Sequence, residues 1–176
     1  MNTSCKSEKI LNVENFRKDG FSHICDVDST TIANWRYKNI NKSLMFDNHN
    51  SWVYFITLDN VIVKVGETGN PLGIPEYWIQ GSFETQPKTG SKSRLGRLRT
   101  GDGTDSYIRE QLAGYIKKGH LVSVWAKKCQ IKVLTESICG VDWHVSTQIH
   151  KSLEIAYLTY FTKKIGKLPL LNKARK

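Results

Sequence analysis

The stretch "SWVYFITLDNVIVKVGETG" (residues 51–69) contains two runs of β-branched and aromatic residues separated by LDN. This composition predicts two antiparallel strands, at about 52–57 and 61–65, joined by a tight turn. Lys64 stands out because its neighbours in VIVKV are all apolar, as in a strand buried on both faces. An ammonium group is costly there unless it has a partner or a function. Tyr54 lies ten residues earlier and is the first candidate for that partner.

The turn decides whether Tyr54 and Lys64 share a face of the hairpin. A three-residue loop at 58–60 would place both side chains on one face. A two-residue turn of Asp59 and Asn60 would pair Lys64 with Phe55 and separate it from Tyr54, unless a bulge restores the register.

The composition is that of a folded, basic protein. Its 176 residues suit one domain with a sizeable core, and 26 Lys and Arg against 16 Asp and Glu give a net charge of +10. Such a surplus favours a polyanionic partner, most commonly nucleic acid, although a solvated basic surface stays the plainer alternative. Four separated cysteines without a CxxC pair, no signal peptide and no apolar run of ~18 residues predict a reducing, cytoplasmic location without a membrane.

Two regions are expected along the chain. Residues 1–45 are polar and are predicted to form an N-terminal helical extension, with helices in "SEKILNVENFRK" and "DSTTIANWRYKN". Residues 46–176 form the main domain, interrupted by a long loop at 67–92 that is rich in Pro and Gly.

Further elements of the main domain follow the loop. "LVSVWAKK" predicts a third strand and "IKVL" a fourth, while helices are expected in "SYIREQLAGYIKKG", capped by Thr104 or Asp105, and over 146–164. The strands and helices do not alternate strictly. We therefore expect an α+β fold with a small central antiparallel β-sheet of three or four strands, flanked by helices.

Two further charged residues call for an explanation. Arg94 begins the basic segment "RLGRLR" just after the long loop. Glu154 lies in a predicted helix among mostly apolar neighbours, so its carboxylate needs a cation or hydrogen bonds.

Together these residues resemble the GIY-YIG nuclease superfamily. "WVY", ending at Tyr54, resembles the first signature strand, and "KVG", beginning at Lys64, resembles the second. Arg94 and Glu154 match the arginine and the helical glutamate that follow in that family, and Asn172 in "PLLN" matches an asparagine near the end of many members.

The resemblance covers roughly residues 50–172 and includes two departures. Trp52 and Val53 replace Gly-Ile, and Lys64 replaces the second signature tyrosine, which resembles a branch that includes type II restriction endonucleases. The link from Gly66 to Arg94 is also longer than usual, which leaves Arg97 and Arg99 as competitors for the role of Arg94.

The resemblance implies a Mg²⁺-dependent DNA endonuclease, acting as a sequence-specific type II restriction-like enzyme on double-stranded DNA. In this interpretation Lys64 is the cation that tunes Tyr54 as a general base, and Arg94 holds the scissile phosphate. Glu154 binds one Mg²⁺ per active site, for which Mn²⁺ can substitute, and the metal assists the leaving group. Cutting both strands favours a homodimer by analogy.

Other residues are weaker candidates. His150, Glu67, Arg97 and Asn172 are candidate auxiliary groups, although His150 also fits a structural, hydrogen-bonded role. We expect a DNA-facing surface formed by the loop and the segment after it, with Lys88, Lys92, Arg97, Arg99 and Trp78.

Two alternatives remain open at this point. One is a catalytically silent member of the fold that binds DNA or a protein. The other is a structure-specific repair or phage nuclease.

Overall fold

The structure, a computed structural model, describes most of the chain. The described residues are 9–28, 35–45, 50–69, 72–73, 94–101, 105–130, 133–147 and 149–172.

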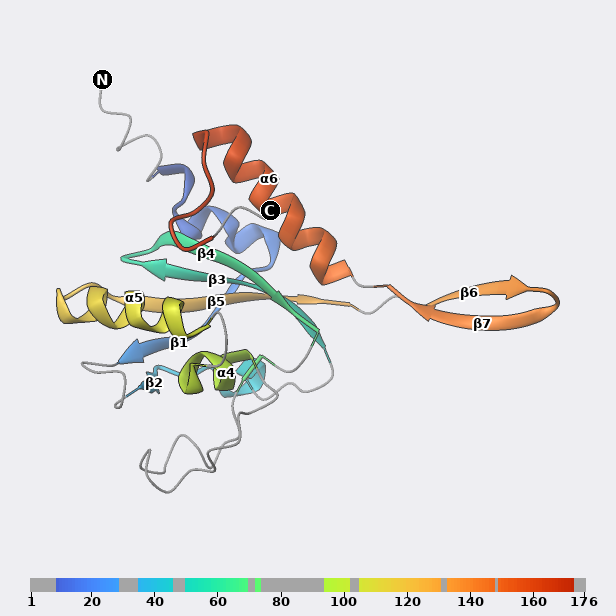
Figure 1. The fold of residues 1–176 in the computed structure, drawn as a ribbon, viewed down its shortest axis with the longest axis horizontal. Coiled ribbons are helices and arrows are strands. Elements are labelled where there is room, and N and C mark those ends of the chain that lie inside the picture. The colour runs from blue at the N-terminus through green and yellow to red at the C-terminus, as the bar shows by residue number, and fades with distance from the viewer. Residues whose placement is uncertain are drawn as a thin grey trace.

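A five-stranded antiparallel sheet forms the centre of the molecule (Figure 1). Its order is β2-β1-β5-β3-β4, so the third and fourth strands of the chain lie together at one end. The strands are β1 (Ser22–Asp28), β2 (Arg36–Lys38), β3 (Ser51–Leu58), β4 (Val61–Thr68) and β5 (Val122–Cys129). The expected α+β class is confirmed. The central sheet has five strands, where three or four were predicted.

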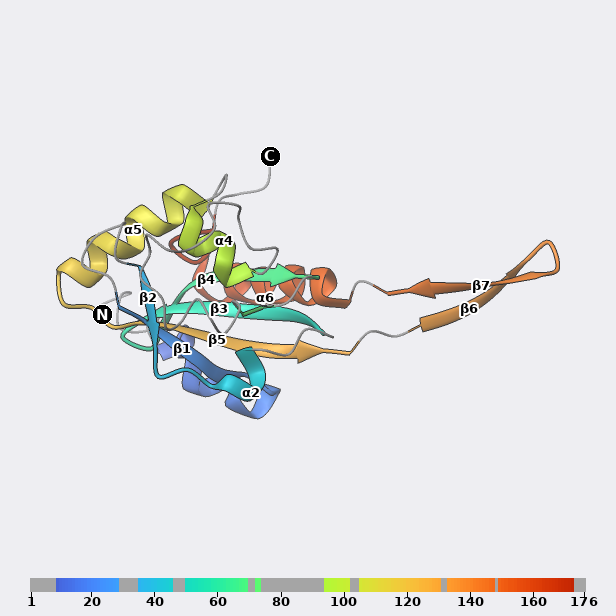
Figure 2. The ribbon, with the colours of Figure 1, turned by 90° about the horizontal axis from the view of Figure 1, so that it is seen from below.

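Helices cover both faces of this sheet, as Figure 2 shows. Tyr54 and Ile56 of β3 face a cluster that includes residues of α4 and α5, whereas Phe55 packs with Phe16 and Phe161 on the opposite face. The helices are the 3-10 helix η1 (Val13–Asp19), α2 (Lys42–Met45), α4 (Arg94–Thr100), α5 (Asp105–Lys117) and α6 (Ile149–Ile165). In the described part of the chain, no helix is both long and apolar enough to cross a membrane.

The β3–β4 hairpin combines a two-residue turn with a bulge. Asp59 and Asn60 both have left-handed φ values, 48° and 68°, which the tightest hairpin turns require. The register then shifts, because Val63 has no partner of its own, and Lys64 pairs with Ile56 instead of Phe55. Tyr54 therefore pairs with Gly66, and Tyr54 and Lys64 lie on the same face.

Two segments from near the two ends of the described chain, residues 11–13 and 171–172, bind the edge strand β4 and the turn before it. On the N-terminal side, Val13 N–H donates to Asn60 O, and Ile62 N–H donates to Leu11 O. On the C-terminal side, Leu171 N–H donates to Val63 O at 2.7 Å. These contacts satisfy backbone groups that an edge strand would otherwise expose.

The predicted N-terminal helical extension is wrong in its described part. Within 1–45, β1 and β2 are strands of the central sheet, and β1 pairs directly with β5. Only η1 and the short α2 are helical elements there, apart from a helical turn at residues 9–10. The segment therefore belongs to the same folded unit as the rest of the chain. The start of the second predicted helix, residues 29–34, lies outside the described residues.

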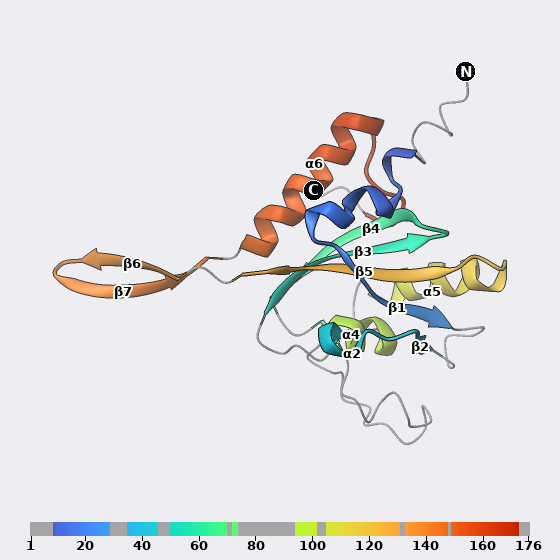
Figure 3. The same cartoon turned by 180° about the vertical axis from the view of Figure 1, so that it is seen from behind.

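The predicted fourth strand is also misplaced. "IKVL" contributes to β6 (Val133–Ile138), which pairs with β7 (Val141–Ser146) in a separate two-stranded hairpin. This hairpin projects from the body of the molecule, as seen from behind in Figure 3. Of the loop expected at 67–92, residues 67–68 belong to β4, and residues 70–71 and 74–92 lie outside the described residues.

Candidate active site

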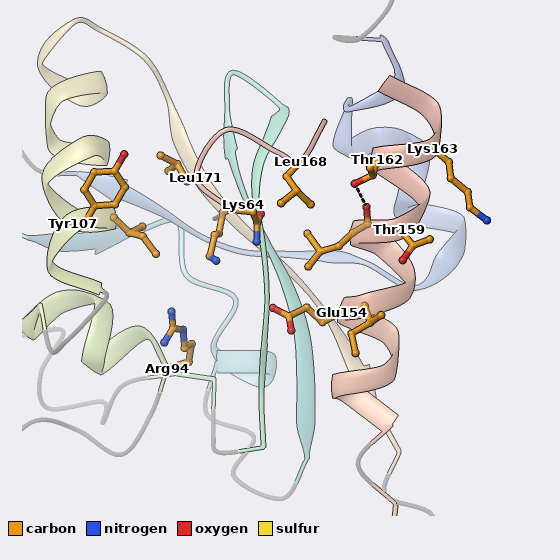
Figure 4. Close-up of a pocket in the computed structure, with 13 residues that line it drawn as sticks. Lys64, Arg94, Tyr107, Glu154, Thr159, Thr162, Lys163, Leu168 and Leu171 are labelled. Carbon is orange, nitrogen blue, oxygen red and sulfur yellow. Dashed lines mark hydrogen bonds between the residues drawn. The ribbon is translucent and has the colours of Figure 1, made fainter. Parts of the chain in front are cut away.

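A cavity of about 590 Å³ lies beside the edge strand β4, between α5 and α6. In Figure 4, Lys64, Arg94 and Glu154 point into the same space from three different elements. Lys64 comes from β4, Arg94 from the first turn of α4, and Glu154 from α6. The wall of the cavity also includes Tyr107, Leu168, Leu171 and Asn172.

Tyr54 packs directly over the backbone of Gly66. A Cβ atom at Gly66 would overlap the phenol ring and hydroxyl of Tyr54, so a larger residue cannot stand there without moving the ring. The glycine of "KVG" is thus required by a close approach between neighbouring strands. Gly66 thus allows the Tyr54 hydroxyl to lie close to the backbone of β4.

The Tyr54 hydroxyl is in direct contact with Arg94. Arg94 Nε donates a hydrogen bond to the Tyr54 hydroxyl oxygen at 2.6 Å. The two terminal nitrogens of Arg94 donate to the carboxylate of Asp105, at 2.8 and 2.5 Å. Both side chains are largely shielded from water, with exposed fractions of 19% for Arg94 and 3% for Asp105. This bidentate pair therefore holds the guanidinium in one orientation.

These contacts set the protonation of the phenol. Burial, with a smaller contribution from the charges of Asp105 and Glu154, raises the pKa of Tyr54 to about 12, against the opposing pull of Arg94. Burial alone would lower the pKa of Arg94, but its contacts with Tyr54 and Asp105 raise it. At neutral pH the ligand-free protein therefore holds a neutral phenol beside a guanidinium.

The arrangement differs from the sequence-based interpretation in one respect. We expected Lys64 to be the cation nearest to Tyr54, and the cation that contacts the hydroxyl is Arg94. Lys64 is half-buried on the same face and lines the cavity together with Glu154, whose side chain is buried. The tuning role predicted for Lys64 stays a prediction.

His150 and Glu67 form a pair near the site. His150 Nε2 lies 3.4 Å from a carboxylate oxygen of Glu67, and the imidazole is buried beside Gly69. His150 precedes Glu154 by one turn of α6. The structure thus brings two of the auxiliary candidates together, next to the helix face that carries Glu154.

Asn172 has its side-chain amide bound to β4. Its oxygen accepts a hydrogen bond from Val65 N–H, and its nitrogen donates to Val65 O, both at 2.8 Å. With Leu171 bound to Val63, these bonds flank Lys64 on the outer edge of the strand. The geometry indicates that Asn172 fixes the backbone around Lys64.

The remaining DNA-binding candidates are less favourably placed or not described. Arg97 is exposed on α4 and does not line the cavity. Arg99 is only 4% exposed, and burial lowers the pKa of its guanidinium. This burial does not favour the predicted contact between Arg99 and DNA, which stays a prediction. Trp78, Lys88 and Lys92 lie outside the described residues.

Sequence reasoning missed one residue of the site. Asp105 was expected only as a candidate helix cap, whereas its carboxylate holds Arg94. A signal was present in the chain: an acidic residue opens a helix directly after a basic helix, across a short Gly-rich turn. Such a turn lets α4 and α5 pack together, and this packing brings Arg94 at the start of α4 to Asp105 at the start of α5.

Among the described residues that line the cavity, Glu154 is the acidic one. Glu154 supplies one buried carboxylate to the cavity, and among the described residues no group of three His, Cys, Asp or Glu side chains gathers to bind a metal. Mg²⁺ commonly takes only one or two carboxylates and completes its coordination with water and substrate phosphates. The residues present therefore fit Mg²⁺ and do not fit a metal that needs a full protein cage.

Comparisons with solved structures support the architecture. A mutant of bacteriophage T4 EndoII has the same fold, with a TM-score of 0.56 and 15% sequence identity over 93% of this chain and 99% of that chain. The restriction endonuclease HPY188I in complex with product DNA aligns with 18% identity over 99% of this chain and 96% of that chain, with a TM-score of 0.45. No family model and no curated protein sequence matches this chain.

Proposed function

We propose that this chain is a DNA endonuclease of GIY-YIG type that hydrolyses phosphodiester bonds with Mg²⁺. The observation that carries the proposal is the meeting of Lys64, Arg94 and Glu154 at one cavity, with Tyr54 hydrogen-bonded to Arg94. The fold shared with EndoII and the net charge of +10 support it.

The chemistry begins with the nucleophilic water. In the proposed mechanism, Tyr54 in its phenolate form takes a proton from water, and the water oxygen attacks the phosphorus. Since the phenol is neutral at pH 7, the active form is a minor one, and the hydrogen bond from Arg94 lowers the cost of forming it. Lys64, on the same face, adds positive charge where the phosphate would sit.

Arg94 then serves two partners. A guanidinium has about five N–H bonds, and three of them are used by Tyr54 and Asp105. The other two can donate to a phosphate oxygen, which is the role predicted for Arg94. Asp105 keeps the fork in place for both contacts.

Glu154 is the residue that would hold the metal. When bound, Mg²⁺ (or Mn²⁺ in its place) would supply electrostatic stabilisation of the departing oxygen. The carboxylate of Glu154 also balances the positive charges of Lys64 and Arg94 in the cavity. His150 and Glu67 support this side of the site.

The substrate follows from charge and by analogy. A chain with a net charge of +10 attracts the phosphates of DNA, and Arg97 is an exposed cation on the helix that carries Arg94. We infer a double-stranded substrate cut at a short sequence, in the manner of small restriction enzymes. Two cuts call for two active sites and hence a homodimer.

One observation favours a second candidate function. The Arg94 charge is already neutralised by Asp105, and the Tyr54 phenol is neutral, as in a site that does not turn over. A catalytically silent DNA-binding protein would show the same contacts. Structure-specific nicking, as by a repair or phage nuclease, is the other outcome to distinguish.

A plasmid assay tests the proposal. The purified chain is incubated with supercoiled plasmid and Mg²⁺, with EDTA in a parallel reaction, and with the Glu154→Gln variant. Discrete linear fragments are expected, and EDTA and Glu154→Gln should abolish them. Glu110→Gln, which changes an exposed carboxylate on α5, is the matched control and should cut normally. DNA that is retained on the protein but never cut would overturn the proposal. Nicks confined to junctions would show a structure-specific nuclease instead of a restriction-like one.

A further inference from the structure

The cavity beside β4 has a charged end and an apolar end. In Figure 4, Arg94 and Glu154 lie at one end of this space, and Lys64 lies in the middle. Beyond Lys64, at the other end, lie Tyr107 and Leu168. The hydrolysis of a phosphodiester uses charged groups, water and a metal, and it has no use for an apolar wall. The second end of the cavity therefore needs an explanation of its own.

The apolar end is built from three parts of the chain. Its side chains come from α5, from α6 and from the segment after α6, and they are Tyr107, Ile108, Leu158, Leu168 and Leu171. Ile108 and Leu171 are buried, whereas Tyr107 is 43% exposed. These five residues form an apolar recess that runs from a buried wall to an aromatic ring within reach of water.

The wall that carries Leu168 and Leu171 is fixed to the sheet. Leu171 N–H donates a hydrogen bond to Val63 O at 2.7 Å, and the side-chain amide of Asn172 makes two hydrogen bonds to the backbone of Val65. The chain itself supplies these bonds, so the recess does not need a ligand to give it shape. A site that is already ordered loses less conformational freedom when it binds.

The two ends together define the kind of ligand that fits. Lys64 and Arg94 attract an anion, and the recess accepts an apolar or aromatic body directly beside that anion. A nucleotide has this pattern, because its phosphate is anionic and its base has a flat face that stacks on aromatic side chains. The cavity volume of about 590 Å³ lies within the range of sites that enclose a small organic ligand. A phosphate alone would use only the charged end.

We propose that the apolar recess binds the nucleoside joined to the phosphate at Arg94, and that Tyr107 stacks on its base. That this phosphate is the one to be cut rests on the proposed function, whereas the binding of a nucleotide does not. In a duplex, both faces of a base are covered by its neighbours. The contact with Tyr107 therefore requires this nucleotide to leave the stack.

The test is a titration of the wild-type chain with small probes in buffer with EDTA, followed by ¹H–¹⁵N NMR. The probes are inorganic phosphate and the 5′ and 3′ monophosphates of thymidine, which add a nucleoside to the phosphate in either direction. At least one monophosphate should bind about tenfold more tightly than inorganic phosphate, because stacking adds to the charge contact. It should also shift the backbone amides of Tyr107 and Leu168, which inorganic phosphate should leave in place.

Variants of Tyr107 test the aromatic contact. Tyr107→Ala should weaken the binding of the preferred monophosphate about tenfold and leave the binding of inorganic phosphate unchanged, whereas Tyr107→Phe keeps the ring and should stay within about twofold of the wild type. Tyr160→Ala is the matched control, because Tyr160 is 42% exposed and lies outside the lining of this cavity. It should bind all probes like the wild type. Circular dichroism and thermal melting check that each variant is folded.

The outcomes separate this inference from the nuclease function. Monophosphates that bind no more tightly than inorganic phosphate, or that bind Tyr107→Ala as tightly as the wild type, overturn the nucleoside site. None of these measurements needs cleavage. A chain that binds a monophosphate through Tyr107 but never cuts DNA would retain this inference and overturn the proposed function. A chain that cuts plasmid but does not distinguish the probes would do the reverse.

Discussion

The cavity beside β4 and the β6–β7 hairpin are both built on antiparallel strands, but they differ in which side chains they bury and which they expose. In the cavity, charged groups are held inside a scaffold: Asp105 fixes Arg94, and Gly66 lets Tyr54 approach the sheet. In the hairpin, large apolar side chains lie in water. Buried charge with fixed partners indicates chemistry, and exposed apolar surface indicates association. A buried charge or an exposed apolar side chain therefore indicates a function only when the groups that contact it are also known.

The largest effect is expected from removing the Tyr54 hydroxyl. Tyr54→Phe keeps the ring over Gly66 but removes the acceptor for Arg94 and the proposed base. We expect the cleavage rate to fall about 10³-fold, within the range for loss of a general base. Single-turnover cleavage of labelled DNA measures this. Tyr160→Phe, a partly exposed tyrosine on α6, is the control, and equal losses in both variants would contradict the role of Tyr54.

Gly66→Ala should cause the next largest loss of cleavage activity. The added methyl group overlaps the Tyr54 ring, so the hydroxyl must move away from Arg94. A displacement of about 1 Å in an active site can cost about 10²-fold in rate. The same assay measures it. Gly114→Ala is the control, because a methyl group there meets nothing within 4 Å. Full activity of Gly66→Ala would show that the position of the hydroxyl is not critical.

Asp105→Asn should change the pH dependence as well as the rate. Asp105 raises the pKa of Tyr54, so its removal should lower that pKa. For the wild type, log rate should rise by about one per pH unit from neutral pH upward, because the phenolate is the base. In Asp105→Asn the rise should level off at a lower pH. Asp28→Asn, an exposed carboxylate on β1, serves as the control. A profile that keeps the wild-type shape would limit Asp105 to a structural role.

Alkaline pH should destabilise the fold through one buried and one partly buried phenol. Burial raises the pKa of both Tyr54 and Tyr157 to about 12, above the ordinary value near 10. The folded state therefore binds more protons than the unfolded chain between about pH 10 and 12, and the free energy of unfolding falls over that interval. Denaturant titrations at several pH values measure it. Tyr54→Phe should reduce the slope, and an unchanged slope would contradict the raised pKa of Tyr54.

The smallest effect is expected in the hairpin. Leu134 is 50% exposed, so Leu134→Ala should change the free energy of unfolding by less than about 0.5 kcal/mol. Leu112→Ala in the buried cluster under α5 should cost about 2–5 kcal/mol. Chemical denaturation followed by tryptophan fluorescence gives both values. A large loss for Leu134→Ala would mean that the hairpin is stabilised within one chain.

The sequence predicted the parts of the molecule whose signals are local. The β3–β4 strands and the terminal helix with Glu154 show regular patterns. Of the four residues chosen from the sequence, Lys64, Arg94 and Glu154 line one cavity, and Tyr54 is hydrogen-bonded to Arg94. The strand β1 was not predicted. A bulge between His23 and Cys25 breaks its alternation of buried and exposed residues, so the adjacent residues Ile24 and Cys25 are both buried. β2 is only three residues long and has one buried side chain.

Contacts between distant elements could not be predicted in the same way. The Arg94–Asp105 pair depends on how α4 packs against α5, and the sequence fixes neither angle nor distance across a Gly-rich turn. The register of Lys64 required both a tight turn and a bulge at Val63, which compensate one another. Each of these features became visible only when the strands and helices were placed in space.

The tail bound to β4 has a consequence for how the molecule is made. The hydrogen bonds that join Val65 to Asn172 connect positions 107 apart in the chain. Contacts of such long range form late in folding, because a large loop must close first. A growing chain on the ribosome cannot complete the strand beside Lys64 until residue 172 has been synthesised. The proposed active site around Lys64 is thus among the last parts of the fold to reach its final geometry.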